Sequence, residues 1–244
     1  MEKEKMKSLI DPSFLLGIAH RGLFGKGIPE NSRKAFQHAI DNCLAFELDV
    51  HLTKDGKTVV SHDSDLFRTT GKKGSIEKLT LEGIRKDYSL SDGESLPTLG
   101  EALSLWNDQN GIVLELKPKH NAACLSKAVL EEISGYDKKK VLIISFSPLA
   151  LLPFQKKYRT LLLVGKEHPS FFFFRFLFDG LDLGKSFSSD KKTIRYSRNH
   201  FVSYWTVKNE EEMKKLLPTC TTLTFQDMDH KIVKEALREK NKLL

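Results

Sequence analysis

AFELDVHL, residues Ala45 to Leu52, alternates apolar and polar side chains along its whole length. Successive residues of a strand point to opposite faces. One face therefore carries Phe46, Leu48, Val50 and Leu52, and the other carries Glu47, Asp49 and His51. A sheet that helices cover on its outside turns its apolar face outward. We therefore expect the two carboxylates to point into the interior of such a sheet.

Strand-like runs alternate with helix-like segments on both sides of this stretch. The helix-like segments are SRKAFQHAIDNC (32–43), Ala122 to Ile133 and Glu210 to Leu217. The further strand candidates are LLGIAH (15–20), TVVSH (58–62), GIVLELK (111–117), VLIISF (141–146), TLLLVG (160–165), Gly180 to Leu183, FVSYWTV (201–207) and TTLTF (221–225). Because such alternation favours a parallel sheet with helices outside, the sequence predicts an α/β fold, a (β/α)8 TIM barrel.

The strand candidates number nine, whereas a closed barrel of this type holds eight. TKDG (53–56) has the composition of a tight turn and joins AFELDVHL to TVVSH. The strands of a hairpin pair antiparallel, so we expect a departure from the ideal barrel at this junction.

Length and composition indicate one domain. A chain of 244 residues is typical of a single α/β barrel, and no internal repeat or flexible linker divides it. We therefore expect one domain over residues 1–244, in which about 14 N-terminal residues form a flexible lead-in. The three cysteines, Cys43, Cys124 and Cys220, have no metal-type spacing and are typical of reduced thiols.

The formal net charge of +7 suits an anionic substrate, an anionic membrane surface or nucleic acid. Nucleic acid is the least favoured of these partners, because no binding motif accompanies the charge. No apolar run is long enough for a signal peptide or a membrane span. We expect a cytoplasmic protein, and the sequence leaves its oligomeric state open.

GIVLELK repeats the alternation and adds Glu115 and Lys117 to the same interior. Buried carboxylates are costly unless a positive charge meets them, and a divalent cation supplies one. Ligands that are all oxygen favour a hard cation, Mg²⁺ or Ca²⁺, over zinc. Together with Arg21 and Lys117, such a cation would leave roughly one positive charge for a phosphodiester anion. The alternative is a set of ordinary ion pairs on a solvated sheet face.

His20, in IAHRG, and His62, in VVSHD, each follow the end of a predicted strand. Residues just past the carboxyl ends of the strands build the active sites of β/α barrels. Hydrolysis of a phosphodiester needs a base and an acid, and histidine serves as either near neutral pH. We interpret His20 and His62 as this pair and the other six histidines as structural.

Four motifs follow one another along the first half of the chain. They are AHRGLFGKGIPENSRKAFQHAI (19–40), FELDVHLTKDGKTVVSHDSDLFRTTG (46–71), LPTLGEAL (96–103) and IVLELK (112–117). In this order they resemble the glycerophosphodiester phosphodiesterase family, and the resemblance continues more thinly through IISFSP (143–148) and YWTVKNEEEM (204–213). Several linked motifs are far more specific than any one of them.

The resemblance implies a TIM barrel and the metal-dependent hydrolysis of glycerophosphodiesters to sn-glycerol 3-phosphate and an alcohol. Carried onto this chain, it gives metal ligands Glu47, Asp49 and Glu115, an acid and base pair His20 and His62, phosphate-binding cations Arg21 and Lys117, and a pocket tryptophan, Trp205. The substrate's own glycerol hydroxyl or a water molecule attacks phosphorus first, and the sequence leaves both routes open.

Near its C-terminus the chain departs from the family pattern. Where the family has a strand such as GVDGIITDYPD, this chain has PTCTTLTFQDMDH (218–230). Because the metal and acid/base positions are intact, we expect catalysis to be retained and the rim of the pocket to change. In PENS we expect Asn31 or Ser32 to cap the following helix, and a second role in orienting the site is the alternative. Trp205 packs either on the substrate or in the core.

FFFFRFLF (171–178) is apolar on almost every side if it is helical. It packs over the barrel or in an oligomer contact, or it makes a peripheral membrane contact or receives a lipid chain. The second interpretation would favour a lysophospholipid substrate and a lysophospholipase D activity. A catalytically silent barrel that binds a phosphodiester is a further alternative, and the presence of every expected metal and histidine position argues against it.

Overall fold

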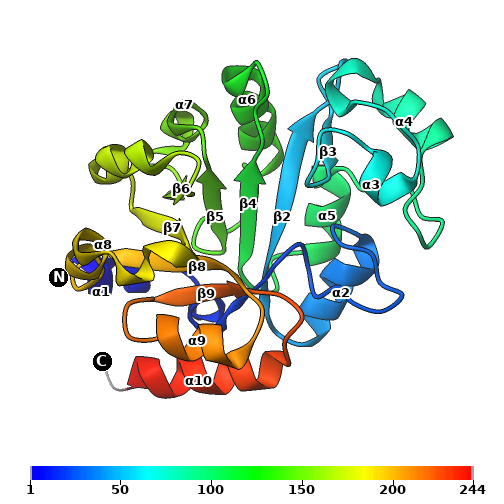
Figure 1. Ribbon diagram of the computed structural model, residues 1–244. Helices are drawn as coiled ribbons and strands as arrows, with labels where there is room; N and C mark the ends of the chain where they lie inside the picture. The colour runs from blue at the N-terminus through cyan, green and yellow to red at the C-terminus, as the bar shows by residue number, and fades with distance from the viewer. Residues whose placement is uncertain (1, 243–244) are drawn as a thin grey trace.

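A computed structural model describes residues 2–242 of the chain, and within them eight parallel strands close into a barrel with helices around it (Figure 1). The strands pair in chain order, and β1 pairs with both β2 and β9 to complete the ring. Their bounds are β1 Ile18–Ala19, β2 Ala45–Leu52, β4 Ile112–Leu116, β5 Val141–Ser145, β6 Arg159–Val164, β7 Gly180–Gly184, β8 Phe201–Val207 and β9 Thr222–Phe225. The predicted TIM barrel is confirmed.

The remaining strand, β3 (Thr58–Val60), pairs antiparallel with β2, with Val60 opposite Val50. Gly56 lies in the turn between them at φ 73°, a conformation that glycine adopts without steric cost. The ninth strand candidate is therefore the second strand of a hairpin, as the turn TKDG predicts.

Helices connect the strands and cover the barrel. The α-helices are α1 Glu2–Ser8, α2 Arg33–Asp41, α3 Phe67–Thr70, α4 Leu81–Asp87, α5 Leu99–Trp106, α6 Ala122–Glu132, α7 Pro148–Leu151, α8 Lys191–Ser197, α9 Glu210–Leu216 and α10 His230–Lys242. The 3₁₀ helices are η1 Pro12–Leu16, η2 Ile76–Lys78, η3 Leu152–Phe154, η4 Pro169–Leu177 and η5 Lys185–Ser189. The predicted helices before β2, after β4 and after β8 correspond to α2, α6 and α9.

Two apolar layers and one polar layer follow from the alternation in the strands. Phe46, Leu48 and Val50 of β2 face outward and pack in the core that the helices cover. Ala45 belongs instead to an inner cluster with Ile18 of β1 and residues of the other strands, which fills the amino end of the barrel. Glu47 and Asp49 follow Ala45 on the same face. The carboxyl end of the interior is therefore polar.

The N-terminal segment is part of the inner core, which corrects the expectation of a flexible lead-in. Met6 of α1, Ile10 and Phe14 of η1 are buried and pack in the same cluster as the inward residues of the strands. Met6 lies in α1, Ile10 in the bend that follows it and Phe14 in η1, so two short helices and the bend between them bring all three side chains to the barrel interior. The lead-in therefore closes the amino end of the barrel.

Between β3 and α5 the chain leaves the barrel and builds a small cluster of its own, at the right in Figure 1. Its buried residues are Val59, Leu66, Ile76, Ile84, Tyr88, Leu90 and Leu96. This satellite core fixes the loops that follow β3, and these loops carry several side chains of the site described below.

The phenylalanine run forms η4. Phe171 and Phe172 pack against the core, whereas Phe173, Phe174, Phe176 and Leu177 are exposed. The interpretation that the run packs over the barrel is therefore wrong for these four residues. Across residues 2–242, no helix is long and apolar enough to cross a membrane, and all three cysteines are free thiols.

Phe14→Ala tests whether the N-terminal segment belongs to the core. The Phe14 ring is fully buried, so the substitution is expected to lower the free energy of unfolding by about 3–5 kcal/mol. Phe67→Ala, at a ring that is 54% exposed, should change it by less than about 1 kcal/mol. Urea denaturation measures both, and equal small losses would mean that the segment does not contribute to the core.

Candidate active site

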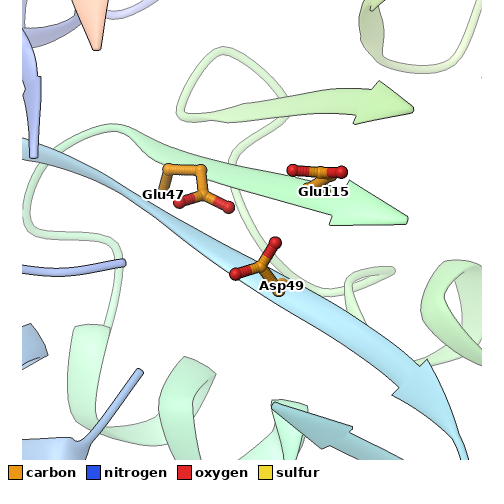
Figure 2. A group of neighbouring side chains, drawn as sticks. All are labelled: Glu47, Asp49 and Glu115. Carbon is orange, nitrogen blue, oxygen red and sulfur yellow. The ribbon is translucent and has the colours of Figure 1, made fainter. Parts of the chain in front are cut away.

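Three carboxylates meet inside the carboxyl end of the barrel (Figure 2). Glu47 and Asp49 come from β2 and Glu115 from β4, and Asp49 is the direct neighbour of Glu115 in the strand register. One oxygen atom from each residue lies within 4.8 Å of the others, and all three side chains are buried. The alternation of AFELDVHL and GIVLELK thus places the carboxylates as the sequence predicts.

Two cations face this cluster. Lys117 Nζ lies 3.0 Å from Asp49 Oδ1 and 2.8 Å from Glu115 Oε1. Arg21 Nε lies 3.5 Å from Asp49 Oδ2, and the backbone N–H of Arg21 donates to Glu47 Oε2 over 2.8 Å. The second oxygen, Glu47 Oε1, is buried and has no donor or cation partner within residues 2–242. Three carboxyl groups therefore face two cations.

The pKa values of the carboxyls reflect this imbalance. Burial, together with Asp49 and Glu115, raises the pKa of Glu47 well above its usual value. Burial also raises the pKa of Glu115 to about 7, against the opposing effect of Lys117. For Asp49 the effect of burial is outweighed by Lys117, His62 and Arg21, which hold its pKa below the usual value. Additional positive charge would therefore favour ionisation of the two glutamates.

The residues present fit a hard divalent cation. All the candidate ligand atoms are carboxylate oxygens, which Mg²⁺ and Ca²⁺ prefer. Glu47 Oε1 is a buried oxygen without a partner, and a buried polar atom normally has one. Glu47, Asp49 and Glu115 would hold the ion.

Ser32 and Asn31 have different roles, one in capping α2 and the other in the carboxylate cluster. Ser32 caps α2, because its hydroxyl accepts from the backbone N–H of Ala35. Asn31 Nδ2 donates to Asp49 Oδ2 over 2.8 Å, so Asn31 fixes a cluster carboxylate. Both Asn31 and Arg21 have left-handed backbone conformations, at φ 52° and 55°. Such conformations are uncommon outside glycine and concentrate at functional sites.

His20 is held by an amide from the other end of the chain. Its Nδ1 lies 2.9 Å from Gln226 Oε1, just after β9. Gln226 Nε2 donates to Asp227 Oδ2 over 2.8 Å, which directs Oε1 toward the histidine. His20 Nδ1 therefore carries the hydrogen atom, and Nε2 has the lone pair. Burial, with Arg21, lowers the pKa of His20 to about 4.

His62 is instead held by a carboxylate. Its Nδ1 lies 2.7 Å from Asp63 Oδ1, and Arg68 Nε in turn donates to Asp63 Oδ2 over 2.5 Å. Burial lowers the pKa of His62, and the negative charge of Asp49 and the hydrogen bond to Asp63 oppose this effect. The two histidines thus have partners of different charge.

The ion pairs extend from the satellite core into the site. Arg68 Nη2 also donates to Glu30 Oε1 over 2.6 Å, and Glu30 Oε1 accepts from Arg21 Nη1 over 2.9 Å. His51 bonds through its two ring nitrogens to Glu77 Oε1 and to the backbone oxygen of His62. The loops after β3 therefore orient Arg21 and the backbone of His62.

A groove of about 520 Å³ leads away from the cluster, and Glu115, Lys117, Phe146 and Phe171 are among the residues that line it. Trp205 does not join the carboxylates directly. Its ring contacts Phe146 edge to face, at a centroid distance of 5.6 Å, and its Nε1 donates to the backbone oxygen of Asp182. Trp205 is therefore half-buried and packs against Phe146, which lines the groove.

The sequence predictions missed several residues that support the site. Gln226 is 206 residues away from His20, and only the closure of the barrel brings them together. Asp63 directly follows His62 in VVSHD and could have been proposed as its partner. Of the two roles expected for Asn31 or Ser32, capping falls to Ser32 and the contact with the site falls to Asn31.

Comparisons with known proteins agree with this geometry. A model of the glycerophosphoryl diester phosphodiesterase family matches residues 20–170. A glycerophosphodiester phosphodiesterase of Caldanaerobacter subterraneus subsp. tengcongensis is 36% identical over 152 residues, which are 58% of this chain and 62% of that protein. The match thus spans less than two thirds of the relative's length.

Two solved structures share the fold. One is a glycerophosphodiester phosphodiesterase from Parabacteroides distasonis, with a TM-score of 0.78, 24% identity and coverage of 92% of this chain and 97% of that one. The other is an Oleispira antarctica phosphodiesterase in complex with the product sn-glycerol-3-phosphate, with a TM-score of 0.77, 26% identity and coverage of 91% and 96%. The family model matches more than half of the residues of this chain, so the chain belongs to the glycerophosphoryl diester phosphodiesterase family.

Proposed function

We propose that the protein hydrolyses glycerophosphodiesters to sn-glycerol 3-phosphate and an alcohol, with a divalent metal ion and with two histidines as acid and base. The observation that carries this proposal is the buried cluster of Glu47, Asp49 and Glu115 beside two cations at the mouth of the barrel. Membership of the family supports the reaction, and the product bound to the Oleispira relative supports the identity of the phosphate product.

Charge explains how the site would receive a phosphodiester. When bound, Mg²⁺ or Ca²⁺ supplies Lewis-acid stabilisation of the phosphoryl oxygens. Lys117 and Arg21 add two positive charges, so the whole cluster would exceed its three carboxylate charges by about one. A phosphodiester carries one negative charge. Lys117 and Arg21 would therefore bind and orient the phosphate as they balance the carboxylates.

The two histidines would have opposite roles in proton transfer. His20 has a neutral amide partner and a pKa lowered to about 4, so its Nε2 is free to accept a proton from the attacking hydroxyl group. Asp63 stabilises the protonated ring of His62 through Nδ1. We therefore assign His20 as the base and His62 as the acid that protonates the leaving alkoxide.

A lysophospholipase D activity is the second candidate. The observation that favours it is the groove itself, since Phe146, Leu149 and Phe171 give it an apolar wall beside Lys117. A groove of this kind could accept the start of an acyl chain on the glycerol moiety. Both candidates use the same phosphate site and differ in what the groove holds.

Metal removal tests the reaction class and separates the two candidates. After treatment with EDTA we expect choline release from glycerophosphocholine to fall to background, because the carboxylates would lose the ion that they hold. Mg²⁺ or Ca²⁺ should restore it, and the better ion identifies the cofactor. Preference for lysophosphatidylcholine over glycerophosphocholine would favour the second candidate. Absence of turnover with both substrates and both ions would contradict the proposal.

Glu47→Ala and His62→Ala should separate metal binding from proton transfer. Glu47→Ala removes a proposed ligand and is expected to impair both the metal affinity, measured by calorimetry, and the turnover. His62→Ala should lower kcat by roughly 10²–10⁴-fold and leave the metal affinity nearly unchanged. Full activity of His62→Ala would show that the assignment of the acid is wrong.

Gln226→Glu tests the assignment of His20. A carboxylate beside Nδ1 stabilises the protonated ring and raises the pKa of His20, which is about 4 in the native protein. Since the base must be neutral, the acid limb of kcat/KM against pH should move upward by about one unit or more. Gln226→Leu, the uncharged control, should lower the activity without this upward shift. An unchanged limb in Gln226→Glu would exclude His20 as the base.

A further inference from the structure

The four exposed apolar residues of η4 lie in two rows. In a 3₁₀ helix, residues i and i+3 lie above one another. Phe173 and Phe176 therefore form one outward row, at 74% and 72% exposure. Phe174 and Leu177 are the exposed members of the next row, which begins with Phe171 at the core. Phe172 belongs to the third row, which faces the barrel. Two adjacent apolar rows are thus presented to solvent.

Arg175 fixes the position of these rings. Its guanidinium carbon lies 4.8 Å from the ring centroid of Phe172 and 3.9 Å from that of Phe176. Arg175 Nη1 also donates to the backbone oxygen of Phe172 over 3.1 Å. The contact holds the Phe176 ring in an exposed position, so the apolar rows are preorganised.

Cations gather next to the apolar rows. A hollow of about 790 Å³ is lined by Phe173 and Phe176 of η4 and by Lys192 and Arg195 of α8. Both cations are exposed, and neither forms an ion pair with a described residue. Asp190 also lines this hollow, but its Oδ1 accepts from the backbone N–H of Thr193 as the cap of α8. The hollow therefore combines aromatic rings with a net positive charge.

The aromatic-basic surface, which we define as Phe173, Phe174, Phe176, Leu177, Lys192 and Arg195, continues into the proposed active site. Phe171 and His168, directly before these rows, line the groove that Glu115 and Lys117 share. The His168 and Phe171 rings stack at 4.9 Å. A flat partner that covers the aromatic-basic surface would therefore lie next to the mouth of the barrel.

We propose that the aromatic-basic surface docks the protein on an anionic lipid bilayer. Exposed phenylalanines that are flanked by lysine and arginine match the boundary between acyl chains and anionic headgroups. The rings would enter the apolar boundary, and Lys192 and Arg195 would contact the headgroups. A soluble protein rarely exposes so many adjacent apolar side chains without a partner. The inference goes beyond the proposed hydrolysis and does not depend on it.

Cosedimentation with vesicles tests the proposal on the full chain. We expect binding to vesicles of phosphatidylcholine with phosphatidylserine, weaker binding to phosphatidylcholine alone, and a decrease when salt is raised. Phe173→Ser with Phe176→Ser should weaken binding roughly tenfold or more. Lys192→Ala with Arg195→Ala should also weaken it roughly tenfold, and only on the anionic vesicles.

Matched controls lie outside the aromatic-basic surface, on α9 and α10 at the bottom of Figure 1. Ile232→Ser on α10 removes an exposed apolar side chain, and Lys214→Ala with Lys215→Ala on α9 removes two exposed charges. Both variants should bind like the native protein. A Phe173→Trp reporter should shift its fluorescence to shorter wavelength on the anionic vesicles.

Three outcomes would overturn the proposal. The first is equal binding of the native protein and the phenylalanine variant, and the second is a Phe173→Trp emission that vesicles leave unchanged. The third is a dimer in solution that the phenylalanine variant abolishes while vesicles bind nothing, which would make a second copy the occupant. Vesicle binding is measured without turnover. Each result can therefore be interpreted even if the protein does not catalyse the proposed hydrolysis.

Discussion

The burial of like charge at the carboxyl end of the barrel is the constraint on which the rest of the site depends. Glu47, Asp49 and Glu115 lie within 4.8 Å of one another and are buried, an arrangement that opposes ionisation unless positive charge compensates it. Lys117 compensates two of them directly. Arg21, in a left-handed backbone conformation, directs its N–H at Glu47 and its Nε at Asp49. The left-handed residues Arg21 and Asn31 thus serve the same electrostatic requirement.

Much of the fold could be predicted because its signals are local. Alternation in AFELDVHL fixed the faces of β2, and TKDG marked the hairpin. The N-terminal segment was less predictable. Its charged residues dominate the composition, and the three apolar residues that pack into the barrel interior are visible only once that interior exists. For η4 the residue types were clear, but which rings are exposed depends on how the segment packs against the barrel, and that contact is not visible in the sequence.

The site was predictable to the extent that a residue's role follows from its own strand. The carboxylates and the two histidines lie on or directly after strands, so alternation and position were sufficient to propose them. Their partners come from elsewhere. Gln226 meets His20 only through the pairing of β9 with β1, and Arg68 meets Glu30 through the satellite core. The C-terminal departure from the family pattern therefore reaches one of the histidines directly, as well as the rim.

The shortness of β1 explains how both histidines reach one cluster. Strand β1 pairs with β2 only at Ala45 and Phe46, so the rest of that edge of β2 is available to other backbone. On this edge, the N–H of Gly22 donates to the backbone oxygen of Glu47. Gly22 lies in the turn that follows His20. The hairpin strand β3 pairs with the rest of this edge of β2. Ser61, the residue before His62, donates its N–H to the backbone oxygen of Asp49. A full-length β1 would occupy these positions, so the departure from the ideal barrel is what brings His62 back to the level of the carboxylates.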